Sequence, residues 1–231
     1  MTTFKIEADP NPPVCKIFLP IIVSVGKIFS KAFLSPPTNI AIFPVAALWH
    51  PPLTGPSRGA VPLDGPVSGG CHRATTGNIA IFVGGERNAF EKILPALTVM
   101  GRKVLHTGDL GTASILKVIT NYLASVHLVA LGEAWTVAKK SNLDLSKTYK
   151  GIAVSSGNSF VHETESQVIL NGSCNINFTM DLVLKDTGLF DDLAKKLKVP
   201  LEISPKVVEI FKDGQKKYGS RAWSSMIVKR M

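Results

Sequence analysis

Residues 58–108 are the first part of the chain with the pattern of a folded domain. Within them, short apolar runs alternate with one amphipathic stretch. Each run is brief and followed closely by glycine, as is typical of buried strands. These runs are residues 60–64, 78–83 and 103–106. Residues 88–100 carry apolar side chains at helical spacing, and Gly101 is a suitable C-cap. The order strand, strand, helix, strand predicts part of an α/β sheet.

After Gly111 the pattern becomes helical. Residues 115–140 are apolar on almost every face, and a Ser-Asn pair ends the run. A helix that is apolar all round is expected to be buried all round, so we expect this one to run through the middle of the protein. Further helices are predicted at residues 146–155, 178–197, 204–217 and 222–229. Residues 109–231 are therefore expected to form an all-helical C-terminal domain.

Residues 1–57 differ in character from the rest. Prolines cluster there, and no acidic residue lies between Pro10 and Pro56. The apolar run 17–26 is shorter than the roughly 20 residues that cross a bilayer and contains Pro20, so no membrane span is predicted. Lysines among apolar residues are compatible with a mitochondrial presequence, whereas the prolines and two early acidic residues argue against one. We interpret this stretch as an unassigned extension, disordered or mis-specified.

Charge and cysteine content exclude several classes of function. The chain has 26 Lys and Arg against 17 Asp and Glu, a formal charge of +9. The basic residues are scattered and not interleaved with aromatic ones, so nucleic-acid binding is not expected, whereas an anionic substrate or cofactor is compatible with this charge. Cys15, Cys71 and Cys174 lie far apart and lack metal-ligand spacing, so no metal site is predicted. Sparse cysteines suit a reducing compartment.

The first candidate for chemistry is the glycine-rich turn that follows the first predicted strand. Residues 64–70 read Asp-Gly-Pro-Val-Ser-Gly-Gly, ending in Ser68, Gly69 and Gly70. Consecutive backbone N–H groups and a hydroxyl at a strand end can bind a carboxylate or a phosphate. An ordinary tight turn is the alternative, and on these residues alone it is favoured.

The second candidate is Lys117, which lies on the long apolar helix with Ser114 and Asn121 on the same face. A lysine is costly to bury in its charged form, so it must reach a cleft, pair with an anion or lose its proton. The alternative is that its ammonium extends past its apolar stem to the surface. The residues alone do not separate these two.

The third candidate is the pair Lys185-Asp186 in the helix predicted at 178–197. Adjacent side chains on a helix point in different directions, so we do not expect a simple salt bridge between them. On their own they indicate a solvated, charged helix face.

Together these motifs, in their order along the chain, resemble those of the β-hydroxyacid dehydrogenases. The ordered set consists of the turn at 64–70, the segment 77–85, Gly111 followed by Lys117 and Asn121, the segments 132–134 and 155–159, and Lys185-Asp186. The resemblance begins near Arg58 and continues to the end of the chain. It implies a partial Rossmann-like α/β sheet followed by an all-α C-terminal domain.

The resemblance also implies roles for the matched residues. The turn formed by Ser68, Gly69 and Gly70 would bind the substrate carboxylate. Lys117 would be the general acid/base, and Asn121 would position Lys117 and the substrate oxygen. Lys185 would reach toward the nicotinamide end of NAD or NADP. Hydride transfer needs a proton partner at the oxygen, and a partly desolvated lysine can serve as one.

Departures from the family pattern limit this resemblance. The family's Gly-x-Gly-x-x-Gly, which lets the chain approach the cofactor pyrophosphate, does not occur in the sequence. Residues 1–57 are also too few for two βαβ units of roughly 30 residues each. We therefore expect the first half of the dinucleotide-binding domain to be absent or replaced. Ala113 and Thr120 stand where the family usually has a glycine and an asparagine.

Two hypotheses follow. The first is an oxidoreductase that uses NAD or NADP on a small 3-hydroxy acid or semialdehyde and is impaired in this chain. The second is a non-catalytic homologue that acts as a dimerisation or interaction module. In both, a homo-oligomer formed through the helical domain is expected, in the cytoplasm or the mitochondrial matrix.

Overall fold

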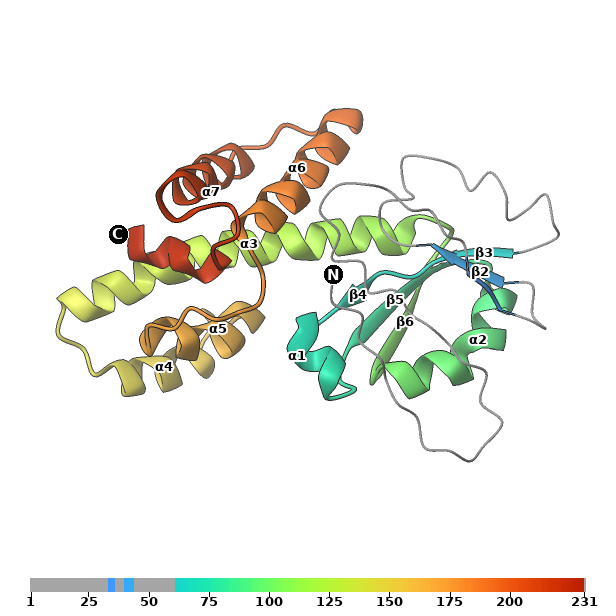
Figure 1. Ribbon diagram of the computed structural model, residues 1–231, viewed down its shortest axis with the longest axis horizontal. Coiled ribbons are helices and arrows are strands. Elements are labelled where there is room, and N and C mark those ends of the chain that lie inside the picture. The colour runs from blue at the N-terminus through green and yellow to red at the C-terminus, as the bar shows by residue number, and fades with distance from the viewer. Residues whose placement is uncertain (1–32, 36–39, 44–60, 231) are drawn as a thin grey trace.

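The computed structural model describes residues 33–35, 40–43 and 61–230, and it consists of an α/β half and a helical half joined by one long helix (Figure 1). This arrangement confirms the predicted fold class. The strands are β1 Phe33–Ser35, β2 Ile40–Phe43, β3 Val61–Asp64, β4 Val67–Ser68, β5 Ala80–Gly85 and β6 Lys103–Gly108. The strands β1 and β2 lie in the stretch 1–57, to which the sequence pattern assigned no element, and the rest of that stretch lies outside the described residues.

The sheet is mixed, and β5 lies at its centre. Strand β6 pairs with β5 in parallel, while β3 and β4 both pair with β5 antiparallel on its other edge. In that edge Leu63 lies opposite Gly85, and Val67 lies opposite Ile81. Strand β2 extends the sheet beside β3 in parallel, and β1 follows antiparallel. The segment between β3 and β4 thus brings Asp64 and Ser68 close to the same strand.

Among the described residues, the α/β half contains the helices α1 Gly70–Thr75, which the pattern did not predict, and α2 Arg87–Met100. Helix α2 buries Phe90, Ile93 and Leu97 together with Leu63 and Val83 of the sheet. This spacing of apolar side chains is the one that predicted the helix at 88–100. Gly101 ends α2, as expected, with its N–H donating to Leu97 O.

Helix α3, Thr112–Lys140, joins the two halves (Figure 1). Its first turns contact β5 and β6, and its later turns contact helices α5, α6 and α7. The expectation that it is buried on every face is wrong, because Ile119, Leu123 and Val137 are 37%, 44% and 64% exposed. By length and composition α3 would also be able to cross a membrane. Packing against both halves buries only part of its apolar surface, including Val118, Leu128 and Trp135.

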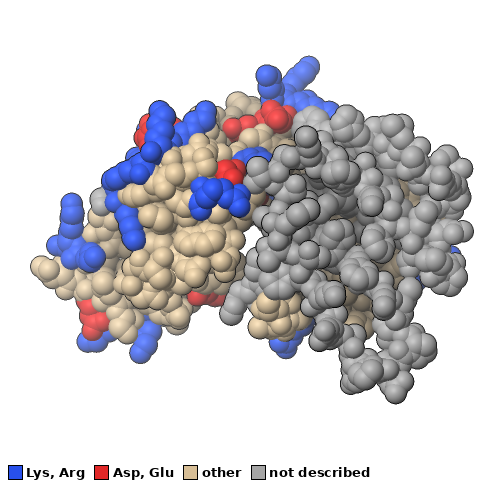
Figure 2. Space-filling view, in the orientation of Figure 1, with Lys and Arg blue, Asp and Glu red and all other residues tan. Residues whose placement is uncertain are grey.

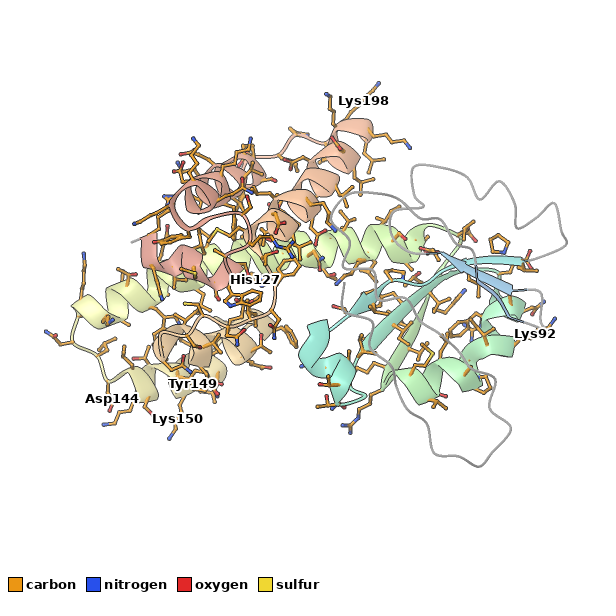
Figure 3. All side chains as sticks on the ribbon, viewed as in Figure 1. Lys92, His127, Asp144, Tyr149, Lys150 and Lys198 are labelled. Atoms are coloured by element: carbon orange, nitrogen blue, oxygen red, sulfur yellow. The ribbon has the colours of Figure 1, made fainter. Side chains whose placement is uncertain are left out.

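The helical half packs around α3. Its elements are α4 Leu145–Ala153, α5 Phe160–Leu170, α6 Met180–Lys196, α7 Ser204–Tyr218 and a 3-10 helix at Ser224–Arg230, where the pattern predicted an α-helix. The core contains Trp135 of α3 with fully buried Met180 and Phe211. Lys150 and Lys198, labelled in Figure 3, are exposed at its outer side. On the face in Figure 2, basic side chains of this half are spread out and mixed with acidic ones.

Helix α5 was missed because polar side chains interrupt its apolar spacing. His162 and Ser166 are both fully buried, and they are hydrogen-bonded through Nδ1 and Oγ at 2.9 Å. Trp135 Nε1 donates to Ser166 Oγ at 3.1 Å, and the Tyr149 ring lies 4.7 Å from the His162 ring (Figure 3 labels Tyr149). Buried polar groups are tolerated when they are paired in this way, and this network attaches α5 to α3 and α4.

The start of α3 is fixed by a carboxylate from the sheet. Asp64, at the end of β3, is 4% exposed, and its two oxygens accept from Gly111 N at 2.9 Å and Ser114 N at 2.7 Å. These N–H groups have no partner within the helix, and an anion is favourable at a helix N-terminus. A Cβ on Gly84 would lie 2.2 Å from Asp64 Oδ1, so glycine is needed there. Asp64 therefore sets where α3 leaves the sheet.

We expect Asp64→Ala to lower the free energy of unfolding by about 2–3 kcal/mol, because two buried N–H groups lose a charged acceptor. The measurement is urea unfolding followed by circular dichroism. Asp109→Ala is the matched control, since Asp109 is exposed beside the same helix end and its loss should change stability by less than about 0.5 kcal/mol. Equal unfolding midpoints for the two variants would contradict the role given to Asp64.

Candidate functional site

Lys117 and Ser68, both singled out in the sequence, meet at the junction of the two halves. Lys117 lies in the second turn of α3, and its Nζ is 3.4 Å from Ser68 Oγ on β4, although 49 positions separate the two residues. The contact exists because β4 and the start of α3 are both held against β5. Lys117 is partly buried and does not extend freely into solvent, as the alternative interpretation required.

Burial changes the proton affinity of Lys117. Loss of hydration disfavours the ammonium and lowers the pKa of Lys117 from 10.5 to about 8. The Asp186 carboxylate opposes this and raises the pKa of Lys117, while the Lys185 ammonium lowers it. An amine with a pKa near 8 is present in both protonation states near neutral pH, so it can either accept or donate a proton.

Helix α6 supplies the charges that act on Lys117. Asp186 is 7% exposed, and its Oδ2 accepts from Asn121 Nδ2 at 2.6 Å. Asn121 is thus fixed by Asp186, a partner that the sequence did not indicate. The expectation that Lys185 and Asp186 do not pair is wrong, because Lys185 Nζ lies 2.7 Å from Asp186 Oδ1. The long lysine stem lets the ammonium fold back over the helix to the buried carboxylate.

The turn after β4 needs glycine for two different reasons. Gly69 has φ +131°, and a Cβ there would lie 2.9 Å from both Cβ and Cδ of Arg73. Gly70 has φ +64°, and nothing lies within 4 Å of the position its Cβ would take. Gly69 is therefore required for both conformation and space, and Gly70 for conformation. These two residues lead from Ser68 into α1, so the turn lies directly beside the Lys117 amine.

Sequence reasoning missed three residues near this site. Asp64 was quoted as part of the turn but received no role, Asp186 was treated as a solvated charge, and Arg73 was not considered. The signal that could have indicated Asp64 was the start of the long helix, which has no capping side chain of its own and therefore needs an acceptor from elsewhere in the chain. For Asp186 it was an acidic residue three positions after the apolar Val183, on the same buried face of α6. Among the described residues, no group of three His, Cys, Asp or Glu side chains is arranged to hold a metal ion.

Comparison with known proteins places this geometry in a family. Residues 111–231 match the model described as NAD-binding of NADP-dependent 3-hydroxyisobutyrate dehydrogenase. The chain belongs to the β-hydroxyacid dehydrogenase family. Residues 56–108 match the NAD binding domain of 6-phosphogluconate dehydrogenase. The resemblance recognised in the sequence is therefore confirmed.

Individual relatives agree with this family. The chain is 32% identical over 203 residues to 2-(hydroxymethyl)glutarate dehydrogenase of Eubacterium barkeri, covering 87% of this chain and 64% of that protein. It is 31% identical to L-threonate dehydrogenase of Haemophilus influenzae, covering 73% of this chain and 57% of that one. The chain thus spans less than two thirds of the length of either relative.

A solved structure has the same fold. The 3-hydroxyisobutyrate dehydrogenase of Salmonella typhimurium superposes with a TM-score of 0.71 at 27% identity. The match covers 81% of this chain and 66% of that structure. Similarity therefore extends over both the α/β half and the helical half of this chain.

We expect Lys117 to titrate near pH 8, with opposite responses to changes at its two charged neighbours. Asp186→Asn removes an anion and should lower the pKa of Lys117 further, whereas Lys185→Gln removes a cation and should raise it. The measurement is NMR of ¹³C-methylated lysines over pH 6–11, with Lys117→Arg used to identify the resonance. A Lys117 resonance that titrates near 10.5, or that moves in the same direction in both variants, would contradict this account.

Proposed function

We propose that this chain carries the substrate-binding and proton-transfer residues of an NAD(P)-dependent dehydrogenase that interconverts a small 3-hydroxy acid and its semialdehyde. The observation that carries the proposal is the Lys117 amine, 3.4 Å from Ser68 Oγ and with its pKa lowered to about 8. Membership of the β-hydroxyacid dehydrogenase family supports the same reaction class.

The proposed chemistry assigns one task to each residue. Ser68 Oγ and the N–H groups of Gly69 and Gly70 bind the substrate carboxylate beside the amine. In the oxidation direction, neutral Lys117 accepts the hydroxyl proton as the carbinol C–H bond breaks and a carbonyl forms. In the reduction direction, the Lys117 ammonium returns that proton to the oxygen. Asn121, oriented by Asp186, donates to the same oxygen in our proposal.

A nicotinamide bound here would supply the hydride acceptor for oxidation and the hydride donor for reduction. We assign Lys185 of α6 to that end of the cofactor; its support is that the side chain is 56% exposed, pairs with Asp186 and is close enough to Lys117 to lower its pKa. The pyrophosphate end has no Gly-x-Gly-x-x-Gly counterpart in the sequence. We therefore propose NAD or NADP as the cofactor and assign none of these residues to its pyrophosphate.

A second candidate function is a non-catalytic homologue that acts through its helical half. One observation favours it: the exposed apolar side chains Ile119, Leu123 and Val137 on α3. In both functions we propose a homo-oligomer formed through the helical half, in the cytoplasm or the mitochondrial matrix. Light scattering after size exclusion tests the assembly, and Leu123→Glu should shift an oligomer toward the monomer.

We expect Lys117→Ala to reduce turnover by about 10²–10⁴-fold, since a positioned general acid/base contributes that much. The assay uses the full chain with 2-(hydroxymethyl)glutarate, L-threonate and 3-hydroxyisobutyrate, each with NAD⁺ and NADP⁺. Lys139→Ala, an exposed lysine at the far end of α3, is the control and should retain the wild-type rate. Turnover that is equal in the two variants would remove Lys117 from the reaction.

The same assay separates the two candidate functions. If the chain turns over no substrate and NADPH fluorescence shows no saturable change, the non-catalytic function stands and the dehydrogenase proposal falls. If NADPH binds and turnover depends on Lys117, the dehydrogenase proposal stands and the non-catalytic function falls.

The dependence of kcat/KM on pH should have opposite slopes for oxidation and for reduction. Oxidation needs the neutral amine, so kcat/KM for the hydroxy acid should rise as the pH passes through about 8 and then level off. Reduction needs the ammonium, so kcat/KM for the semialdehyde should fall over the same interval. Profiles that run parallel in both directions would contradict the assignment of Lys117 as the shared acid and base.

A further inference from the structure

Arg73 lies against the proposed carboxylate-binding turn from the α1 side. It belongs to α1, Gly70–Thr75, and its Cβ and Cδ both lie 2.9 Å from where a Cβ on Gly69 would stand. The arginine stem therefore packs against the backbone of the same turn whose Ser68 hydroxyl contacts the Lys117 amine. The family resemblance assigned no role to this residue.

The guanidinium of Arg73 reaches the helical half. Its Cζ lies 4.2 Å from the centre of the Phe160 ring, at the first residue of α5. Phe160 is 48% exposed, although it is a large apolar side chain at the junction of the two halves. Figure 1 shows α1 as the part of the α/β half that lies next to α5. The positive charge is thus held between the two halves, on the side of the site where the turn lies.

Arg73 has its hydrogen-bonding capacity left for a ligand. Within residues 61–230, no carboxylate forms an ion pair with it. Acidic Glu163 in the first turn of α5 accepts instead from Asn158 Nδ2 at 2.9 Å. A guanidinium above an aromatic ring keeps the N–H donors at its edge available, and those donors match the two oxygens of a carboxylate. The aromatic contact fixes where these donors are presented.

We propose that Arg73 is a specificity-determining residue that binds a second carboxylate, so that the preferred substrates are hydroxy acids with two carboxylates. The proposal rests on the proposed function, because the first carboxylate is taken to occupy the turn at Ser68–Gly70. The second carboxylate extends from the turn toward α1 and α5, while the reacting hydroxyl stays beside Lys117. Phe160 acts as a positioning residue that holds the guanidinium in place.

The test compares two unreactive probes, glutarate and butyrate, which differ by one carboxylate. Chemical-shift titrations of the ¹⁵N-labelled full chain, without cofactor, give the ratio of their dissociation constants. We expect Arg73→Gln to reduce the preference for glutarate over butyrate by about tenfold to a hundredfold, the effect of losing one charge-assisted contact. Arg73→Lys should recover part of the preference, and Phe160→Leu should weaken it less than Arg73→Gln does.

Arg102→Gln is the matched control, because Arg102 is exposed and lies between α2 and β6, away from the turn. It should leave the glutarate preference at the wild-type value. The proposal is overturned if wild-type protein does not prefer glutarate, or if Arg73→Gln weakens both probes equally. Circular dichroism of each variant identifies any loss of folding. If Arg73→Gln does not fold, Arg73→Lys decides: equal dissociation constants for glutarate and butyrate in this variant, which keeps the positive charge, would overturn the proposal.

Turnover separates this proposal from the one on which it rests. If the glutarate preference depends on Arg73 while turnover is independent of Lys117, the specificity assignment stands and the dehydrogenase proposal fails. If turnover depends on Lys117 while Arg73→Gln leaves the ratio of kcat/KM for 2-(hydroxymethyl)glutarate over 3-hydroxyisobutyrate unchanged, the specificity assignment alone fails.

Discussion

The carboxylate of Asp64 at the N-terminus of α3 determines the geometry of the whole site. It accepts from two N–H groups of that helix while lying at the end of β3, so it fixes the helix relative to the sheet. The Lys117 amine lies one turn further along the same helix and meets Ser68, which follows Asp64 in the chain. The distance between the amine and the turn is therefore set by one buried ion at a helix end.

The helical half determines the chemistry of the amine that the sheet has positioned. Burial between the halves lowers the pKa of Lys117, and Asp186 limits that shift. Asp186 in turn contacts Asn121 and Lys185, so one carboxylate of α6 links these two polar side chains beside the amine. The arrangement gives an amine that is neither permanently charged nor permanently neutral, because hydration loss and the nearby anion act in opposite directions.

The elements with a strong apolar period were predictable from the sequence, and those held together by polar contacts were not. Helix α2, built on Phe90, Ile93 and Leu97, the strands β3, β5 and β6, and the long apolar helix α3 appear close to their expected bounds. Helix α5 was missed because His162 and Ser166 are polar and yet fully buried: they bond each other one turn apart within α5, and Trp135 of α3 donates to Ser166 Oγ from 31 positions away. A polar residue that is buried because its partner lies far away in sequence gives no local signal.

The candidate site likewise has residues that the sequence could identify and contacts that it could not. Lys117, Ser68 and Asn121 could be identified as residue types at matching positions, and the amine does lie beside the turn. The Lys185–Asp186 ion pair and the Arg73–Phe160 contact depend on side-chain conformation and on the docking of two halves, so spacing alone could not indicate them.

Because α3 is continuous from the Asp64 contact to the core of the helical half, the two halves share a rigid connector. A hinge in a flexible loop would let them separate freely, but here the connection is a helix of 29 residues anchored at both ends. Any widening of the junction between the two halves must bend α3 or break the hydrogen bonds of Gly111 and Ser114 with Asp64. Rotation of one half away from the other is therefore opposed by the helix itself and by the two hydrogen bonds that Asp64 accepts at its start.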